Sequence, residues 1–137
     1  MPGTKVSEDA GSAFAAGKSF SRGAWCVNRG LQPFWPDRSG WTESVWLSLH
    51  GNTITRRKLI SNDEVLIWTQ GFVTPTTIRG INAVLKAMDM PWRACIKKCQ
   101  AMVYSIGTGN QIMLPLVEGM KLTHSVESGM APAIGGQ

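Results

Sequence analysis

Three cysteines and two histidines are the residues of this chain best suited to bind a metal or to act as nucleophiles. Cys95 and Cys99 lie four positions apart, and His50 and His124 could complete the four nitrogen and sulfur ligands that zinc prefers. Zinc knuckles more often have two residues between their cysteines, and on a strand Cys95 and Cys99 would merely share one face. A Cys–His nucleophile pair would also need a third, orienting group, and none is evident.

Two further segments resemble catalytic motifs only superficially. Gly107-Thr108-Gly109 lacks the remaining glycine and the lysine of a phosphate-binding loop, and it joins two predicted strands. Asp63-Glu64 lies in a predicted polar turn, without a neighbour suited to general acid–base work. The sequence therefore predicts a protein that is not an enzyme, with no cofactor, no metal site and no catalytic residue.

The charge distribution favours a binding function. The net charge is +5, and eight basic residues against three acidic ones lie between residues 50 and 100. A local excess of this kind indicates a polyanionic partner, although a solvated face on a mildly basic domain would give the same pattern. The chain is 43% hydrophobic and 17% charged, which favours a folded domain over a disordered tail.

Six tryptophans are many for 137 residues, and most are expected in the core. Trp46 alternates away from the apolar face of its strand and is expected near Arg57 across a hairpin, where it could stack on a base or anchor a protein partner. We therefore expect one basic sheet face that binds nucleic acid or a protein, formed by Arg56, Arg57, Lys58, Arg93, Lys97, Lys98, Trp46 and Trp92. Exposed charges contribute little to folding, so Arg56 and Arg57 should be replaceable by Glu without loss of stability.

The elements that would position these residues lie between Val45 and Val117. Alternating apolar residues predict a strand at Val45–His50, and Gly51-Asn52 predicts a two-residue hairpin turn into a return strand that starts at Thr53. A third strand is expected at Val65–Thr69, and two more at Trp92–Tyr104 and Gln111–Val117. Pro115 lacks an amide hydrogen, which places the last of these at a sheet edge.

One amphipathic helix is expected at Pro75–Met88. Thr74 is a suitable N-cap, and Pro75 fits the first helical position, where its missing N–H has no cost. The helix carries one apolar stripe, which should pack on one face of the sheet: Ile78, Ile81, Val84, Leu85 and Met88.

These elements predict an α+β fold with a small antiparallel sheet of about five strands, in the order β-β-β-α-β-β, and one helix on one face. Residues 1–44 are expected to form an irregular N-terminal extension that can include one short helix, at Ala10–Gly17, and one strand, at Ser19–Val27. Residues 45–120 should form the core domain, and residues 121–137 a flexible tail.

The segments His50-Gly51-Asn52-Thr53-Ile54 and Gly71-Phe72-Val73-Thr74-Pro75-Thr76-Thr77, followed by Asn82-Ala83, resemble short accessory proteins of phages and mobile elements. The resemblance covers residues 45–120 and carries over no catalytic residue. A fainter similarity to the helix and hairpin of a class of RNA-cleaving toxins lacks the histidine of that class, since the comparable positions read Lys97-Lys98-Cys99-Gln100. The resemblance implies an accessory protein rather than a nuclease.

Three functions follow from these patterns. The first is a non-enzymatic accessory protein that binds nucleic acid through the basic face. The second is an inhibitor that binds a host defence protein, and the third is a virion or assembly component, with self-association or a larger assembly. The three cysteines, an odd number, argue against a disulfide framework, and no apolar run is long enough to span a bilayer. We expect a cytoplasmic protein without a membrane partner.

Overall fold

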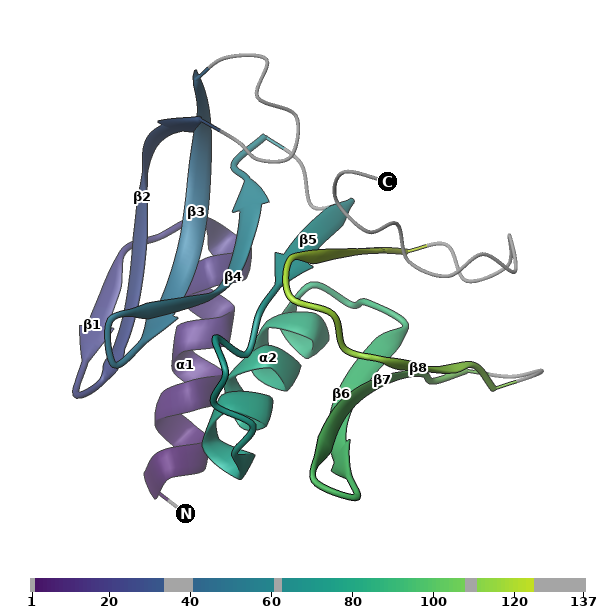
Figure 1. The fold of residues 1–137 in the computed structure, drawn as a ribbon. Coiled ribbons are helices and arrows are strands. Elements are labelled where there is room, and N and C mark those ends of the chain that lie inside the picture. Colours follow the sequence, from purple (N-terminus) through teal and green to yellow (C-terminus); the bar gives the residue numbers. More distant parts are fainter. Residues whose placement is uncertain (1, 34–40, 61–62, 108–110, 125–137) are drawn as a thin grey trace.

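The computed structural model describes residues 2–33, 41–60, 63–107 and 111–124, and these form two helices and nine strands (Figure 1). The elements are α1 (Pro2–Ala16), β1 (Phe20–Arg22), β2 (Trp25–Pro33), β3 (Trp41–Leu49), β4 (Asn52–Lys58), β5 (Glu64–Ile67), α2 (Pro75–Ala87), β6 (Trp92–Lys97), β7 (Gln100–Ser105), β8 (Met113–Pro115) and β9 (Met120–Thr123). The predicted α+β class is confirmed.

The strands form two antiparallel sheets instead of one. Six strands pair in the order β1-β2-β3-β4-β5-β9, and three pair in the order β6-β7-β8. The two helices lie side by side on one face of the larger sheet, and the smaller sheet lies beyond α2 (Figure 1). The prediction of one sheet of about five strands with a single helix is therefore wrong in these details.

The N-terminal third is part of the core, unlike the predicted irregular extension. Ala10 and Phe14 of α1 are fully buried, and α1 packs on α2 at Gly11. A Cβ on Gly11 would lie 2.6 Å from the carbonyl oxygen of Ala83, so the two helices approach closely through small residues. Helix α1 is rich in Ala, Gly and Ser, and its packing surface consequently lacks the large apolar stripe by which helices are recognised in sequences.

The C-terminal boundary also differs from the prediction. Strand β9 pairs with β5, and its Met120 and Leu122 are buried in the common core. The predicted tail from residue 121 therefore begins inside a sheet strand, while residues 125–137 lie outside the described part of the chain.

Helix α2 forms as the sequence predicts. The Thr74 side chain accepts a hydrogen bond from the backbone N–H of Thr77, and Pro75 occupies the first turn. All five residues of the predicted apolar stripe are buried, together with Leu47, Leu49, Ile54 and Ile67 of the larger sheet. Local capping and a clear 3.6-residue period make this helix recognisable from the sequence.

The β3–β4 hairpin has a different register from the predicted one. Its two-residue turn is His50-Gly51, with φ values of 52° and 81°, and the pairing shifts between Leu47 and Ser48. Both turn residues have positive φ, as a type I′ turn requires. The shift places Arg56 opposite Trp46. Arg57 instead lies opposite Val45, on the buried face.

The segment predicted as one strand from Trp92 to Tyr104 is a hairpin. Lys98 and Cys99 form its turn with φ values of 52° and 63°, conformations in which Gly or Asn is usual. The absence of such turn residues explains why the sequence did not indicate a break here. Strand β8 with Pro115 lies at the edge of the smaller sheet, as predicted.

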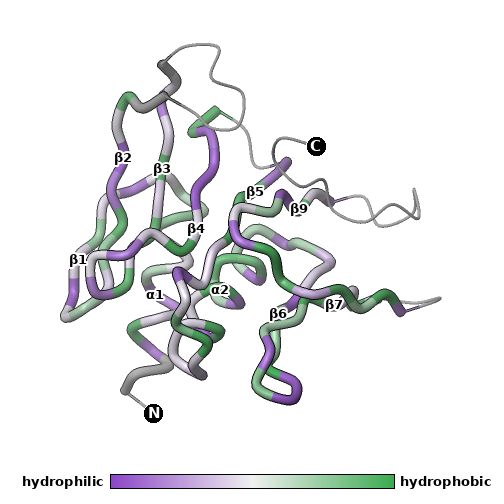
Figure 2. The backbone as a smooth tube through the Cα atoms, viewed as in Figure 1, coloured by the Kyte–Doolittle hydropathy of each residue, from purple (hydrophilic) through white to green (hydrophobic). Residues whose placement is uncertain are grey.

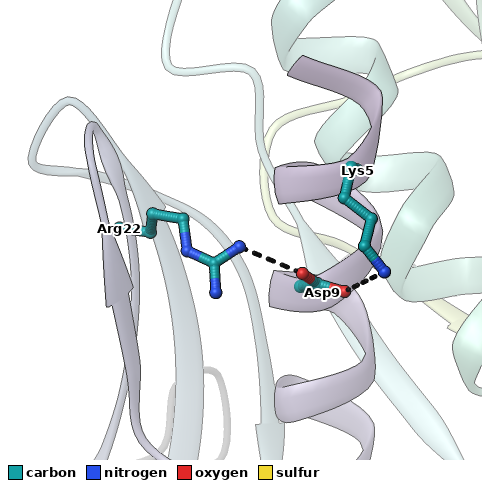
Figure 3. A network of polar contacts seen from close by, with 3 residues as sticks. All are labelled: Lys5, Asp9 and Arg22. Atoms are coloured by element: carbon teal, nitrogen blue, oxygen red, sulfur yellow. Dashed lines mark hydrogen bonds and ion pairs between the residues drawn. The ribbon is translucent and has the colours of Figure 1, made fainter. Parts of the chain in front are cut away.

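An exposed ion-pair network joins the outer side of α1 to β1 (Figure 3). Asp9 lies 3.5 Å from Lys5, one turn earlier in the helix, and 3.1 Å from Arg22 of β1. Solvent-exposed pairs of this kind contribute little to stability, so the buried small-residue contact holds α1 in place more than these charges do. In the described part of the chain, neither helix has the length and apolarity needed to cross a bilayer.

Candidate functional site

Arg57 is a structural residue rather than a surface cation. Its exposed fraction is 2%, and its guanidinium donates hydrogen bonds to the carbonyl oxygens of Phe14 and Ala15 at 2.9 Å each. It also donates to the carbonyls of Lys58 and Leu59 at 3.0 and 3.3 Å. A cation at the C-terminal end of α1 satisfies free carbonyls and complements the helix dipole. Desolvation by burial lowers the pKa of this guanidinium, and the prediction that Arg57 contacts a polyanion is wrong.

Arg56, Lys58 and Trp46 lie on the opposite face of the larger sheet. Arg56 is directly across from Trp46, and all three side chains are half-buried. Burial lowers the pKa of the Arg56 guanidinium, whose Nε has no hydrogen-bond partner among the described residues. This face points away from both helices, because the alternate residues Val45 and Leu47 pack in the core.

The second group of predicted site residues lies on the smaller sheet. Trp92 is 1% exposed, and its indole N–H donates to the carbonyl of Thr123 at 3.0 Å, so it is a core residue and not a stacking surface. Arg93 is half-buried, and Lys97 and Lys98 are exposed at the β6–β7 turn. The two basic segments belong to different sheets, and the predicted single basic sheet face does not form.

A groove of about 580 Å³ lies between the helices and the β6–β7 hairpin. We call it the α2–β6 groove, and the residues that line it are Ser7, Glu8, Pro75, Ile78, Arg79, Asn82, Ala83, Lys86, Arg93, Ile96 and Tyr104. It contains three basic side chains and a single acidic one, so its charge favours an anionic ligand. Arg79 and Lys86 form no ion pair within the described part of the chain.

The helical period places these cations together. One side of α2, opposite the buried stripe, carries Arg79, Asn82, Ala83 and Lys86. These residues share a side because spacings of three or four residues are close to one helical turn and a spacing of seven is close to two. Arg79 and Lys86 are two turns apart, or about 10 Å along the axis. Ala83 contacts α1 and Asn82 contacts β6, so this side of α2 forms the floor of the groove.

Asn82 and Arg93 fix the wall that β6 contributes. The Asn82 amide donates to the carbonyl of Ala94 at 2.9 Å and accepts from its N–H at 2.7 Å, as a neighbouring strand would. The Arg93 guanidinium donates to the carbonyls of Met90 and Trp92 at 2.8 and 2.7 Å. The two hydrogen bonds of the Arg93 guanidinium hold its side chain in place, so ligand binding costs little side-chain entropy there.

Two of the groove residues carry a signal in the sequence. Arg79 and Lys86 belong to the basic excess between residues 50 and 100, and they share one helix side at an interval of seven residues. Tyr104 has no such signal, since its place in the wall depends on the unpredicted β6–β7 turn.

A second, smaller cavity of about 330 Å³ lies near the β3–β4 turn and the start of α2. Threonine side chains and Phe72 dominate its lining, which includes His50 but no lysine, arginine or carboxylate. It therefore lacks the charge that makes the α2–β6 groove a candidate site.

The cysteines and histidines do not converge on a common point. Cys26, Cys95 and Cys99 are free thiols, and His124 lies 3.0 Å from the carbonyl of Met88. No group of three or more metal-binding side chains occurs among the residues that the structure describes. The prediction of no metal site and no cofactor remains a prediction.

Comparisons with known proteins do not add to this description: no protein-family model, no curated protein and no solved structure matches the chain.

Proposed function

We propose that this chain is a non-enzymatic nucleic-acid-binding protein whose phosphate-contacting surface is the α2–β6 groove, extended by the β6–β7 turn. The observation that carries the proposal is the meeting of Arg79, Lys86 and Arg93 in one groove from two elements. Lysine and arginine side chains that line a groove bind phosphates by charge, without base specificity.

Two features of the β6–β7 hairpin support the same function. Lys97 and Lys98 extend the positive charge of the groove beyond Arg93, and Lys98 keeps a backbone conformation with positive φ. Asn or Gly would adopt that conformation at lower cost, so a lysine there suggests a functional reason for its side chain. Tyr104 lines the groove beside these cations and offers an aromatic surface for base stacking.

The proposal retains the predicted ligand but moves the site. Arg93, Lys97 and Lys98 remain in it, and Arg79, Lys86 and Tyr104 are added. The other predicted residues lie outside it: Arg57 and Trp92 are buried, and Arg56, Lys58 and Trp46 lie on the outer face of the larger sheet. An origin in phages or mobile elements stays a prediction, as does a cytoplasmic location.

Salt-titrated binding of labelled 20-nucleotide DNA and RNA, single- and double-stranded, tests the proposal. We expect binding at low salt that weakens steeply as salt is added, with a log–log slope of roughly one unit per phosphate contacted. Three variants that each change one cation to Glu separate the candidate surfaces: Lys86→Glu in the groove, Arg56→Glu on the larger sheet and Lys18→Glu, an exposed position after α1, as the matched control.

The proposal predicts that Lys86→Glu weakens binding at least tenfold, while Arg56→Glu and Lys18→Glu change it less than twofold. Equal losses in all three variants would show that total charge, not the groove, determines binding. A loss confined to Arg56→Glu would move the site to the outer face of the larger sheet. Negligible binding of every oligonucleotide at low salt would end the proposal.

A further inference from the structure

The smaller sheet has one buried face and one open face. Trp92, Ala94, Ala101 and Val103 alternate along β6 and β7 on the inner face and are all at most 5% exposed. The side chains between them point to the other side, because successive residues of a strand alternate in direction. Each of these outward side chains is half-buried or exposed, so no described segment covers this face completely.

We define the outer face by its paired rows. Arg93, Tyr104 and Met113 form one row across the three strands, and Cys95, Met102 and Pro115 form the next. Lys97 follows on the β6 side. Apart from the two cations at the border, these side chains are apolar or aromatic, and Met113 is 39% exposed.

This composition is unusual for the solvent side of an antiparallel sheet, which is normally polar. The corresponding row of the larger sheet is mixed, because the polar residues Asn28, Arg56 and Lys121 alternate there with Trp46 and the buried Leu66. Hydrophobic residues predominate along β7, on the side of the molecule away from β1, and the β6–β7 turn is hydrophilic (Figure 2).

Methionine, tyrosine and arginine are enriched at the centres of protein interfaces, whereas exposed sheet faces elsewhere avoid them. Flexible methionine side chains also adapt to the shape of a partner. An apolar patch with a charged border is typical of a surface that binds another protein.

The charges of the border select the partner. Arg93 and Lys97 lie on the outer face and Lys98 lies in the adjoining turn, while the sequence has no Asp or Glu between Met90 and Val117. A second copy of this chain would bring like charges together at the same border, which disfavours self-association through this face. An acidic border on the partner would complement it.

We propose that the outer face of the β6–β7–β8 sheet is a docking surface for a protein segment with apolar residues at its centre and Asp or Glu at its border. This inference goes beyond the proposed nucleic-acid function. The two surfaces share Arg93, Tyr104, Lys97 and Lys98, but the central residues of the docking surface, Met102, Met113 and Pro115, lie outside the α2–β6 groove.

Selection from a displayed library of random 12-residue peptides against the full chain tests the inference. The selected peptides are then titrated into protein labelled with carbon-13 at the methionine methyl groups. Signals of Met102 and Met113 report on the outer face, and those of the buried Met88, Met90 and Met120 serve as internal controls. The test variant is Met113→Lys, and Ile60→Lys, at a position 87% exposed between β4 and β5, is the matched control.

We expect selected peptides that combine apolar residues with a net negative charge, that shift the Met102 and Met113 signals, and that bind Met113→Lys at least tenfold more weakly. Ile60→Lys and Lys86→Glu should bind them nearly as well as the unmodified chain does. The inference is overturned if no peptide is enriched, if enriched peptides bind Met113→Lys equally well, or if they carry no excess of acidic residues. Methionine shifts that depend on protein concentration alone would instead assign the face to a second copy.

Discussion

Replacement of the buried Arg57 by Met tests whether this side chain anchors α1. The substitution keeps an apolar stem but removes the guanidinium, which donates to four carbonyl oxygens, three of them within 3.0 Å. Among the described contacts, the carbonyl of the half-buried Ala15 has no other donor, so the substitution would leave it unpaired. The Arg57 guanidinium also lies 5.4 Å from the centre of the Phe14 ring, a contact that the variant loses.

The expected loss of stability follows from these contacts. A hydrogen bond to a charged group contributes about 1.5–3 kcal/mol, but bonds that share one guanidinium are not additive. Loss of the donor leaves partly buried carbonyl groups unpaired at about 1–3 kcal/mol each, so we expect Arg57→Met to cost about 3–5 kcal/mol in total. With a urea m-value of about 2 kcal/mol/M, the unfolding midpoint should fall by roughly 1.5–2.5 M.

The assay is urea unfolding followed by tryptophan fluorescence, for which the buried Trp25 and Trp92 provide the signal. Arg56→Met is the matched control, because Arg56 is the same residue type on the same strand but points to the other face. It should cost less than about 1 kcal/mol, as expected for a residue away from buried networks. If Arg57→Met destabilises the protein no more than Arg56→Met does, Arg57 does not hold α1 and the reasoning fails.

Three other substitutions test the packing that shapes the groove. Gly11→Ala should destabilise by about 1–3 kcal/mol, measured as a shift of the urea midpoint, because its new Cβ would contact the backbone of Ala83; an unchanged midpoint would contradict the close helix approach. Asn82→Asp should cost about 1–3 kcal/mol and increase hydrogen exchange in β6, since a carboxylate cannot donate to the Ala94 carbonyl. Cys99→Gly should increase the free energy of unfolding by about 1 kcal/mol, and so raise the thermal midpoint, because glycine adopts the positive φ of 63° without strain. A lower thermal midpoint would refute this.

Much of the local structure could be predicted from sequence. Thr74 and Pro75 marked the start of α2, its 3.6-residue period identified the buried stripe, and Pro115 indicated an edge strand. Each of these signals depends on residues close together in the chain, where capping, periodicity and a missing amide hydrogen act directly on the backbone.

The candidate site was predictable only in part. The basic residues Arg93, Lys97 and Lys98 lie in the groove or next to it, as candidate site residues should. Arg57 and Trp92, in contrast, are buried in the protein. The β3–β4 turn is shifted by one residue from the expected position, and a bulge follows it. Because side chains alternate along a strand, such a small change of register decides which of two adjacent arginines faces the core.

Local patterns in the sequence are sufficient to predict the α+β class, the position and buried stripe of α2, and the concentration of positive charge in the middle of the chain. Three other features become visible only in the folded chain: α1 belongs to the core, the strands divide into two sheets, and Arg79, Lys86 and Arg93 share a groove. They depend on packing between distant segments, which requires shape complementarity, as at Gly11 and Ala83, and small residues leave no periodic apolar signal of such packing in the sequence.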